Sequence, residues 1–235
     1  MSPVVGFAAV IKGLAADHRV VAYDRAGYGG SDAAPLSVEL QLQDLVAVLE
    51  AAGPGPRVVV GHSWGGLLAQ LAAWDRPDLV DGLVLLDPSH EAFWTPAPEL
   101  PGDEVRRAEL LANANEQAQT TARAAETAPE IERLLVDACL SYVETAEQQA
   151  VQLAEVPMIL EHLGELAERR TKAVWPEIPV RLLTATKGRP EFMTTRVLAL
   201  LDELPGTNTV VPDSGHYLHL DRPDLVIAAV REVAG

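Results

Sequence analysis

The residues with the clearest chemical potential lie in the run 57–66, which reads RVVVGHSWGG and carries Ser63 in a G-x-S-x-G pattern. The serine follows a buried β-branched run and precedes a predicted helix, so we expect it on a sharp strand-to-helix turn. We expect positions 61 and 65 to require glycine, because a side chain there would keep the strand and the helix from approaching closely. The start of that helix directs free N–H groups at the place where an oxyanion would form. This context favours a nucleophilic serine over a plain tight turn.

A serine hydroxyl is a poor nucleophile unless an imidazole removes its proton, so a histidine must approach Ser63 from elsewhere in the fold. His216 is best placed, because it follows the last strand signal in DSGH and precedes the final helix. We predict that His219 packs at the rim near that helix and that His62 orients its neighbours. Solvated or packing roles are assigned to His18, His90 and His162. No histidine pair has ligand spacing with a carboxylate to suggest a metal site. Acyl transfer by a serine, a histidine and an acid needs no cofactor, so we expect neither metal nor cofactor.

The elements that must position these residues alternate between two patterns. Short β-branched strands are predicted at Val20-Val21, 58–60, 83–86, Val180–Thr184 and Thr209–Val211. Between them lie segments whose apolar residues recur every three or four positions, such as the helix from Ser37 to Ala52 and the closing helix from Pro223 to Val233. This alternation predicts an α/β fold with a mostly parallel sheet and crossover helices.

Strand signals stop between residues 88 and 176, where Ala, Glu and Gln-rich stretches are punctuated by prolines, among them Pro129 and Pro157. We interpret residues 88–176 as an inserted helical cap. The core is then formed by residues 1–87 and 177–235.

Three stretches of the chain resemble the α/β-hydrolase superfamily, in its capped esterase, peroxidase-like and peptidase-like branch. They read RVVVGHSWGGLLAQLAA, VVAYDRAGYGGSD and SGHYLHLDRPDLV. The resemblance implies the α/β-hydrolase fold, mostly parallel with helices on both faces, and the chain order serine, acid, histidine. Relatives that dehalogenate alkanes or open epoxides carry aspartate at the nucleophile position, so Ser63 indicates acyl transfer instead.

The acid of the catalytic triad has two candidates. Most relatives place it in a turn after the strand that matches 180–184, but that turn here contains no acid. Some branches use the end of the preceding strand, where this chain has Asp87. We therefore assign Asp87 as the residue that orients His216, with Glu191 in reserve.

The N-terminal part is shorter than the resemblance implies, because a central strand ending in His-Gly is missing. Pro3-Val4-Val5 can fill its place in the sheet, followed by Gly6-Phe7 and a crossover helix over Ala8–Asp17. The backbone N–H of Phe7 would then join that of Trp64 in the oxyanion hole. The alternative is a shortened relative with impaired or no catalysis.

The inserted segment, residues 88–176, is expected to form the roof of the substrate pocket and to decide substrate specificity. Candidates for its apolar lining, against the alternative of plain packing, are Phe93, Trp94, Tyr142, Met158 and Trp175. Residues 88–176 carry seven basic against 16 acidic residues, a balance that disfavours anionic substrates. We predict a serine hydrolase that acts on a small neutral, partly hydrophobic ester or amide through an acyl-enzyme. Two alternatives stay open: a protein that binds a small hydrophobic metabolite without hydrolysis, and cyclisation or lyase chemistry.

The net charge and the cysteine count exclude several classes of partner and site. The formal net charge of −16 has the wrong sign for nucleic acid or for an anionic membrane surface. One cysteine, Cys139, excludes an internal disulfide framework and a thiolate metal cluster. No stretch is predicted to be a signal peptide or to span a membrane, so we expect a cytoplasmic protein whose partner is a small-molecule substrate. Its oligomeric state stays open.

Overall fold

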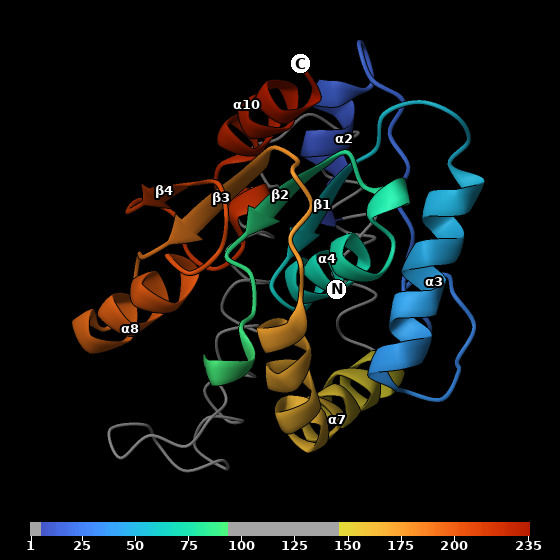
Figure 1. The fold of residues 1–235 in the computed structure, drawn as a ribbon, viewed down its shortest axis with the longest axis vertical. Coiled ribbons are helices and arrows are strands. Elements are labelled where there is room, and N and C mark those ends of the chain that lie inside the picture. The colour runs from blue at the N-terminus through green and yellow to red at the C-terminus, as the bar shows by residue number, and fades with distance from the viewer. Residues whose placement is uncertain (1–5, 94–145) are drawn as a thin grey trace.

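A computed structural model describes residues 6–93 and 146–235 and places four parallel strands in one sheet, in the order β1-β2-β3-β4 (Figure 1). The strands are β1 (Val58–His62), β2 (Gly82–Leu86), β3 (Val180–Ala185) and β4 (Thr207–Val211). Each contains one of the strands predicted from the sequence, so those four predictions are confirmed. The parallel sheet with its helices agrees with the α/β-hydrolase fold that the resemblance implies.

Helices cover both faces of this sheet, because every strand residue points to the face opposite that of its neighbour. In β2, Leu83 and Leu85 join the core beneath α3 and α4, whereas Val84 and Leu86 pack toward α2 and α10. Figure 1 shows these two helix layers on opposite sides of the strands. The helices are α2 (Ala8–Leu14), α3 (Val38–Ala51), α4 (Trp64–Asp75) and α10 (Pro223–Ala234).

The signals that start and end α3 act as the sequence predicts. The Ser37 hydroxyl accepts a hydrogen bond from the Leu40 N–H and caps the first turn. Gly53, just beyond the helix, has a φ of 82°, which a residue without Cβ adopts at little cost.

The strand predicted at Val20-Val21 is not present as a strand. Residues 19–25 run without a strand assignment, and Val21 is 50% exposed. A strand exists through its ladder to a neighbour, and the neighbour expected here, Pro3-Val4-Val5, lies outside the described residues. The crossover helix predicted over Ala8–Asp17 is confirmed as α2, three residues shorter.

Within the predicted cap, residues 88–93 and 146–176 are described, and they contain helix but no strand. A short 3-10 helix, η2 (Glu91–Phe93), follows β2, and α7 (Ala146–Lys172) leads back to β3. Pro157 lies inside α7 instead of separating two helices. The Arg170 guanidinium binds both carboxylate oxygens of Glu91, at 2.6 and 2.8 Å, so a buried ion pair joins the two ends of the segment. The remaining helices are α8 (Glu191–Leu201) and α9 (Leu218–Asp221).

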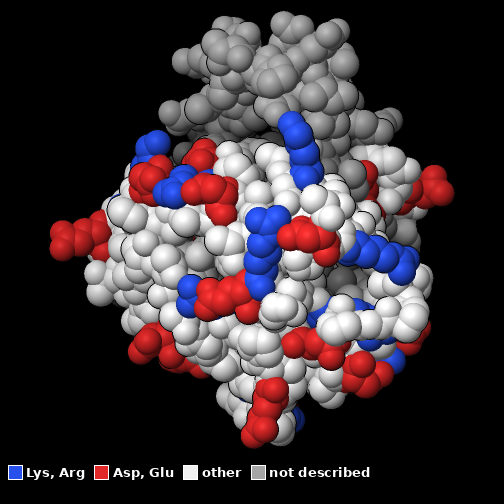
Figure 2. Space-filling view, turned by 90° about the horizontal axis from the view of Figure 1, so that it is seen from above, with Lys and Arg blue, Asp and Glu red and all other residues white. Residues whose placement is uncertain are grey.

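Several basic side chains on the surface lie beside acidic ones. On the face in Figure 2, blue basic side chains border red acidic ones. Arg222, for example, contacts both Asp213 and Asp224. None of the helices in the described part of the chain is long and apolar enough to cross a membrane.

Candidate active site

The carboxyl ends of the strands meet at one edge of the sheet, and the predicted catalytic residues follow them. His62 pairs with Leu86 in register, so Ser63 and Asp87 leave adjacent strands side by side. His216 comes five residues after the last residue of β4, whose neighbour is β3. Parallel strands thus collect residues that are 24 to 153 positions apart in the chain.

Ser63 occupies the turn expected for an activated serine. It has a φ of 53° between β1 and α4, in the left-handed region that non-glycine residues rarely adopt. Two hydrogen bonds hold the strained backbone: the Ser63 N–H donates to the Leu86 carbonyl at 3.0 Å, and the Ser63 carbonyl accepts from the Ser89 N–H at 2.8 Å. Helix α4 begins at the next residue, Trp64, so its N-terminal N–H groups lie beside the serine.

The glycines around this turn differ from the expected pair. A Cβ on Gly61 would lie 2.5 Å from the Gly65 carbonyl oxygen, which confirms that β1 and α4 touch there. A Cβ on Gly65 would meet no neighbouring atom within 4 Å, so the expectation for Gly65 is wrong. Gly66 is the second crowded position, because its Cβ would lie 2.7 Å from Pro88. The helix approaches the chain after β2 one residue later than the motif suggests.

The crowding at Gly61 and the open space at Gly65 predict opposite effects for alanine at the two positions. We expect Gly61→Ala to lower the free energy of unfolding by about 1–3 kcal/mol, because the new methyl group overlaps backbone atoms that cannot rotate away. Gly65→Ala is expected to be neutral or stabilising by up to about 1 kcal/mol, because alanine favours the helix and the space is open. Urea unfolding of both variants beside the wild type measures the two values, and equal losses would contradict the geometry.

Asp87 and His216 are in direct contact. The Nδ1–H of His216 donates to Asp87 Oδ2 at 2.6 Å, and Asp87 is buried while His216 keeps 43% of its side chain exposed. Burial by itself raises the pKa of Asp87, but the hydrogen bond from His216 and the charge of Arg189 outweigh it and hold the pKa below its ordinary value. Asp87 is therefore an ionised acceptor that fixes the ring with Nε2 away from the carboxylate.

Arg189 is a member of this site that sequence reasoning missed. Its guanidinium donates to Asp87 Oδ2 at 2.7 Å, so one carboxylate oxygen accepts from both the arginine and His216. Arg189 lies in the turn after β3 where an acid was expected, and no spacing rule signals that a cation there reaches back to β2. Glu191, the reserve acid, is exposed at the start of α8.

Ser63 and His216 lie in one neighbourhood without a direct hydrogen bond. The rings of His62 and His216 have centroids 4.5 Å apart, which places His216 against the residue before Ser63. Within residues 6–93 and 146–235, no hydrogen bond joins the Ser63 hydroxyl to the His216 ring. Such bonds are often long before a substrate is bound.

Two further histidines, His62 and His219, lie close to His216. The Nε2–H of His62 donates to the His216 carbonyl at 2.8 Å, which agrees with the predicted orienting role. His219 is wrong as a rim residue: it is 3% exposed and stacks on Phe7 with ring centroids 4.3 Å apart. The rings of Phe7, His62 and Tyr217 lie next to the His219 ring. Phe7 directly precedes α2, and its ring is the part that contacts His219.

Buried His219 makes stability depend on pH. Burial, together with nearby His216, lowers the pKa of His219 to about 3. The unfolded chain therefore binds a proton below about pH 6.5 that the folded chain does not, so this contribution to stability is complete above pH 6.5 and declines as the pH falls. We expect the contribution of His219 to the free energy of unfolding to decrease by about 2 kcal/mol between pH 6.5 and 5.

The variant His219→Phe keeps the aromatic contact with Phe7 and removes the titration. Its free energy of unfolding in urea should fall less than that of the wild type between pH 7 and 5. Parallel losses in the two proteins would contradict the assignment.

Three of the five predicted lining residues lie in the described part of the chain. Met158 is buried in the main core, and Trp175 packs against the same core with its ring edge-to-face on Trp74, at 5.2 Å between centroids. Phe93 is half-buried beside His90. Met158 and Trp175 thus contribute packing between α7 and the body, the alternative interpretation of these residues. Trp94 and Tyr142 lie outside the described residues.

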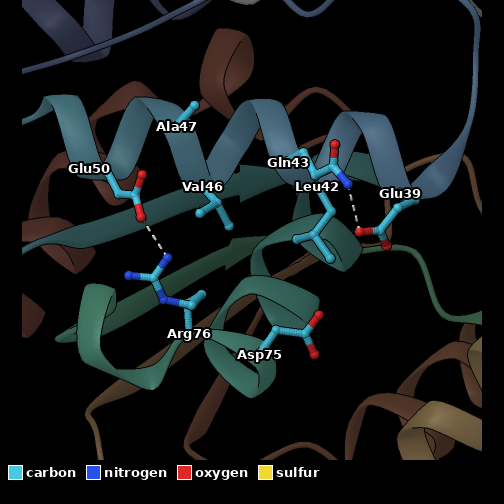
Figure 3. A pocket seen from close by; sticks show the side chains of 8 residues that line it. All are labelled: Glu39, Leu42, Gln43, Val46, Ala47, Glu50, Asp75 and Arg76. Atoms are coloured by element: carbon cyan, nitrogen blue, oxygen red, sulfur yellow. Dashed lines mark hydrogen bonds and ion pairs between the residues drawn. The ribbon is translucent and has the colours of Figure 1, made fainter.

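A groove of about 270 Å³ lies elsewhere, between α3 and the end of α4 (Figure 3). Leu42 and Val46 form its floor, and charged side chains such as Glu50 and Arg76 surround it. Arg76 donates to Glu50 at 2.7 Å across the groove. None of the predicted catalytic residues contributes to its walls. No group of three or more His, Cys, Asp or Glu in the described part of the chain is arranged to hold a metal ion.

Comparison with known proteins agrees with the fold. The alpha/beta hydrolase family model matches residues 4–229, and the chain belongs to this family. The protein is similar to lipase LipV of Mycobacterium tuberculosis, 31% identical over 228 residues, which is 92% of this chain and 83% of the lipase. Epoxide hydrolase 4 of Mus musculus is 35% identical over 83 residues, 34% of this chain and 23% of that protein.

Solved structures agree with this assignment of the fold. Cfl2 from Burkholderia cenocepacia superposes with a TM-score of 0.72 at 20% identity, covering 98% of this chain and 84% of its own. A probable hydrolytic enzyme from Pseudomonas aeruginosa does so with a TM-score of 0.62 at 25% identity, covering 96% and 80%. Family and relatives together define the protein as a hydrolase.

Proposed function

We propose that the protein is a serine hydrolase that cleaves a small neutral, partly hydrophobic ester or amide through an acyl-enzyme. The observation that carries this proposal is the strained Ser63 turn beside an exposed imidazole whose far nitrogen is held by the buried carboxylate of Asp87. This arrangement supplies a nucleophile, a base and a group that orients the base.

The reaction follows from these positions. His216 Nε2 accepts the Ser63 proton as the oxygen attacks the carbonyl carbon, and Asp87 stabilises the imidazolium that forms. The N–H of Trp64, at the start of α4, and the N–H of Phe7 donate to the oxyanion. His216 then protonates the leaving group, and water repeats the sequence to release the acid. No cofactor takes part in these steps.

The proposed substrate class rests on charge and on the nucleophile. The acidic excess of residues 88–176 repels anionic acyl groups. The similarity to a lipase supports an ester, and serine in place of aspartate argues against opening of epoxides.

Labelling with a fluorophosphonate tests the nucleophile directly. The wild type should become covalently labelled at Ser63, as peptide mapping by mass spectrometry will show, and Ser63→Ala should stay unlabelled. Labelling of Ser214, a buried serine three residues after β4, is not expected and serves as an internal control. An unlabelled wild type that still binds a neutral hydrophobic ligand would support the non-hydrolytic alternative.

A further inference from the structure

A buried polar network connects helix α7 of the predicted cap to the serine turn. Glu155 of α7 forms an ion pair with Arg25, and its second oxygen accepts from the Tyr28 hydroxyl at 2.8 Å. Arg25 and Glu155 keep only 16% and 12% of their side chains exposed. The pair is thus largely removed from water. Loss of one partner from a buried ion pair is strongly destabilising, because it leaves an uncompensated charge.

Gln41 of α3 extends this network to the residue after the nucleophile. Its Oε1 accepts from Arg25 Nη1 at 2.8 Å and from the Trp64 indole N–H at 2.6 Å. Its Nε2 donates to Glu155 at 3.1 Å. Arginine and indole only donate, and an ionised carboxylate only accepts, so these partners allow one orientation of the Gln41 amide. Glu155 therefore fixes the amide whose oxygen holds Trp64.

The core residues of this network also contact one another without the help of Glu155. The Tyr28 N–H donates to the Arg25 carbonyl at 2.8 Å, and the Arg25 guanidinium lies 4.9 Å from the centre of the Tyr28 ring. Gln41 and Trp64 are both buried. Arg25, Tyr28 and Gln41 thus form a socket into which the carboxylate of Glu155 fits.

We propose that Glu155 is a positioning residue, which sets the Trp64 backbone through Gln41 when α7 docks and so completes the oxyanion hole. The inference rests on the proposed function. Its physical basis is that the Trp64 indole and the Trp64 N–H belong to one residue in the first turn of α4. Trp64 is buried, so its indole has little room to rotate by itself and a displaced ring displaces the N–H. Misplacement by about 1 Å at a reacting centre lowers rates by about 100-fold.

Kinetics with p-nitrophenyl acetate test this role, because so short an ester has little surface to contact the cap. We expect Glu155→Gln and Gln41→Met each to lower kcat by about tenfold to 100-fold, with KM changed less than twofold. In a Trp64→Phe background, Glu155→Gln should have no further effect on kcat. A cap that only roofs the pocket would instead leave kcat for this ester unchanged.

The ion pair between Glu91 and Arg170 offers a matched control. It also joins α7 to the chain after β2, and Arg170 contacts Trp74 and Gln70 instead of Trp64. Glu91→Gln makes the same chemical change at a buried carboxylate. It should lower the melting temperature, as Glu155→Gln does, but leave kcat within twofold of the wild type. Equal losses of kcat in Glu91→Gln and Glu155→Gln would overturn the proposal.

A second measurement does not depend on hydrolysis. In ¹⁵N-labelled protein, the Trp64 indole resonance is identified by its loss in Trp64→Phe. Glu155→Gln should shift the Trp64 indole and backbone amide resonances, and Glu91→Gln should leave both in place. Unmoved Trp64 resonances in folded Glu155→Gln would overturn the coupling even if the wild type hydrolyses esters. Shifted resonances in a protein that hydrolyses none would support it while the proposed function fails.

Discussion

Replacing His216 by alanine is expected to lower kcat for a short ester by about a million-fold. The imidazole is the only base placed to receive the Ser63 proton in the proposed mechanism, and loss of serine or base in a triad removes nearly the whole contribution of the unit. Ser63→Ala/His216→Ala should therefore be no slower than His216→Ala. The measurement is turnover of p-nitrophenyl acetate, corrected for spontaneous hydrolysis.

His219→Phe is the control for this experiment. His219 lies three residues after His216 and belongs to the same aromatic cluster, but it is buried against Phe7. A loss of activity confined to His216→Ala would agree with the proposed roles. If His219→Phe were equally inactive and still folded, the assignment of the base would be wrong.

Asp87→Asn is expected to lower kcat by about 10⁴-fold. An asparagine amide can hold His216 only in the wrong tautomer or not at all, and it cannot stabilise the imidazolium. Glu191→Gln should leave kcat unchanged, because Glu191 is exposed at the start of α8 and Asp87 is the group bonded to His216. An active Asp87→Asn protein together with an inactive Glu191→Gln protein would reverse the assignment.

Because Arg189 also binds Asp87, Asp87→Asn is expected to lower stability as well as kcat, and a second variant separates the two effects. Asp87→Asn leaves a largely buried guanidinium without its carboxylate, which costs about 3–5 kcal/mol of stability when a buried pair is broken. The double variant Asp87→Asn/Arg189→Met removes both charges and should recover much of the melting temperature. Its kcat should stay as low as that of Asp87→Asn, because the catalytic defect lies in the histidine's partner and not in folding.

Local signals predicted most of the framework. Four strands, the α3 helix with its Ser37 cap, and the Ser63 turn depend on alternation, periodicity and turn chemistry, which act within about ten residues. The choice of Asp87 over Glu191 came from the resemblance to the α/β-hydrolase superfamily, because some of its branches place the acid at the end of the strand that matches 83–86. The contact between Asp87 and His216 agrees with that choice.

The sequence alone therefore predicted the order of the strands and helices, and it indicated Ser63, His216 and Asp87 as the catalytic residues that we propose. The tertiary structure decided which glycine is crowded, that His219 is buried, that Arg189 reaches Asp87, and that Glu155 of α7 connects through Gln41 to Trp64. These features join residues on different elements, where side-chain length and packing angle set the contact. Periodicity and motif spacing carry no information about either quantity.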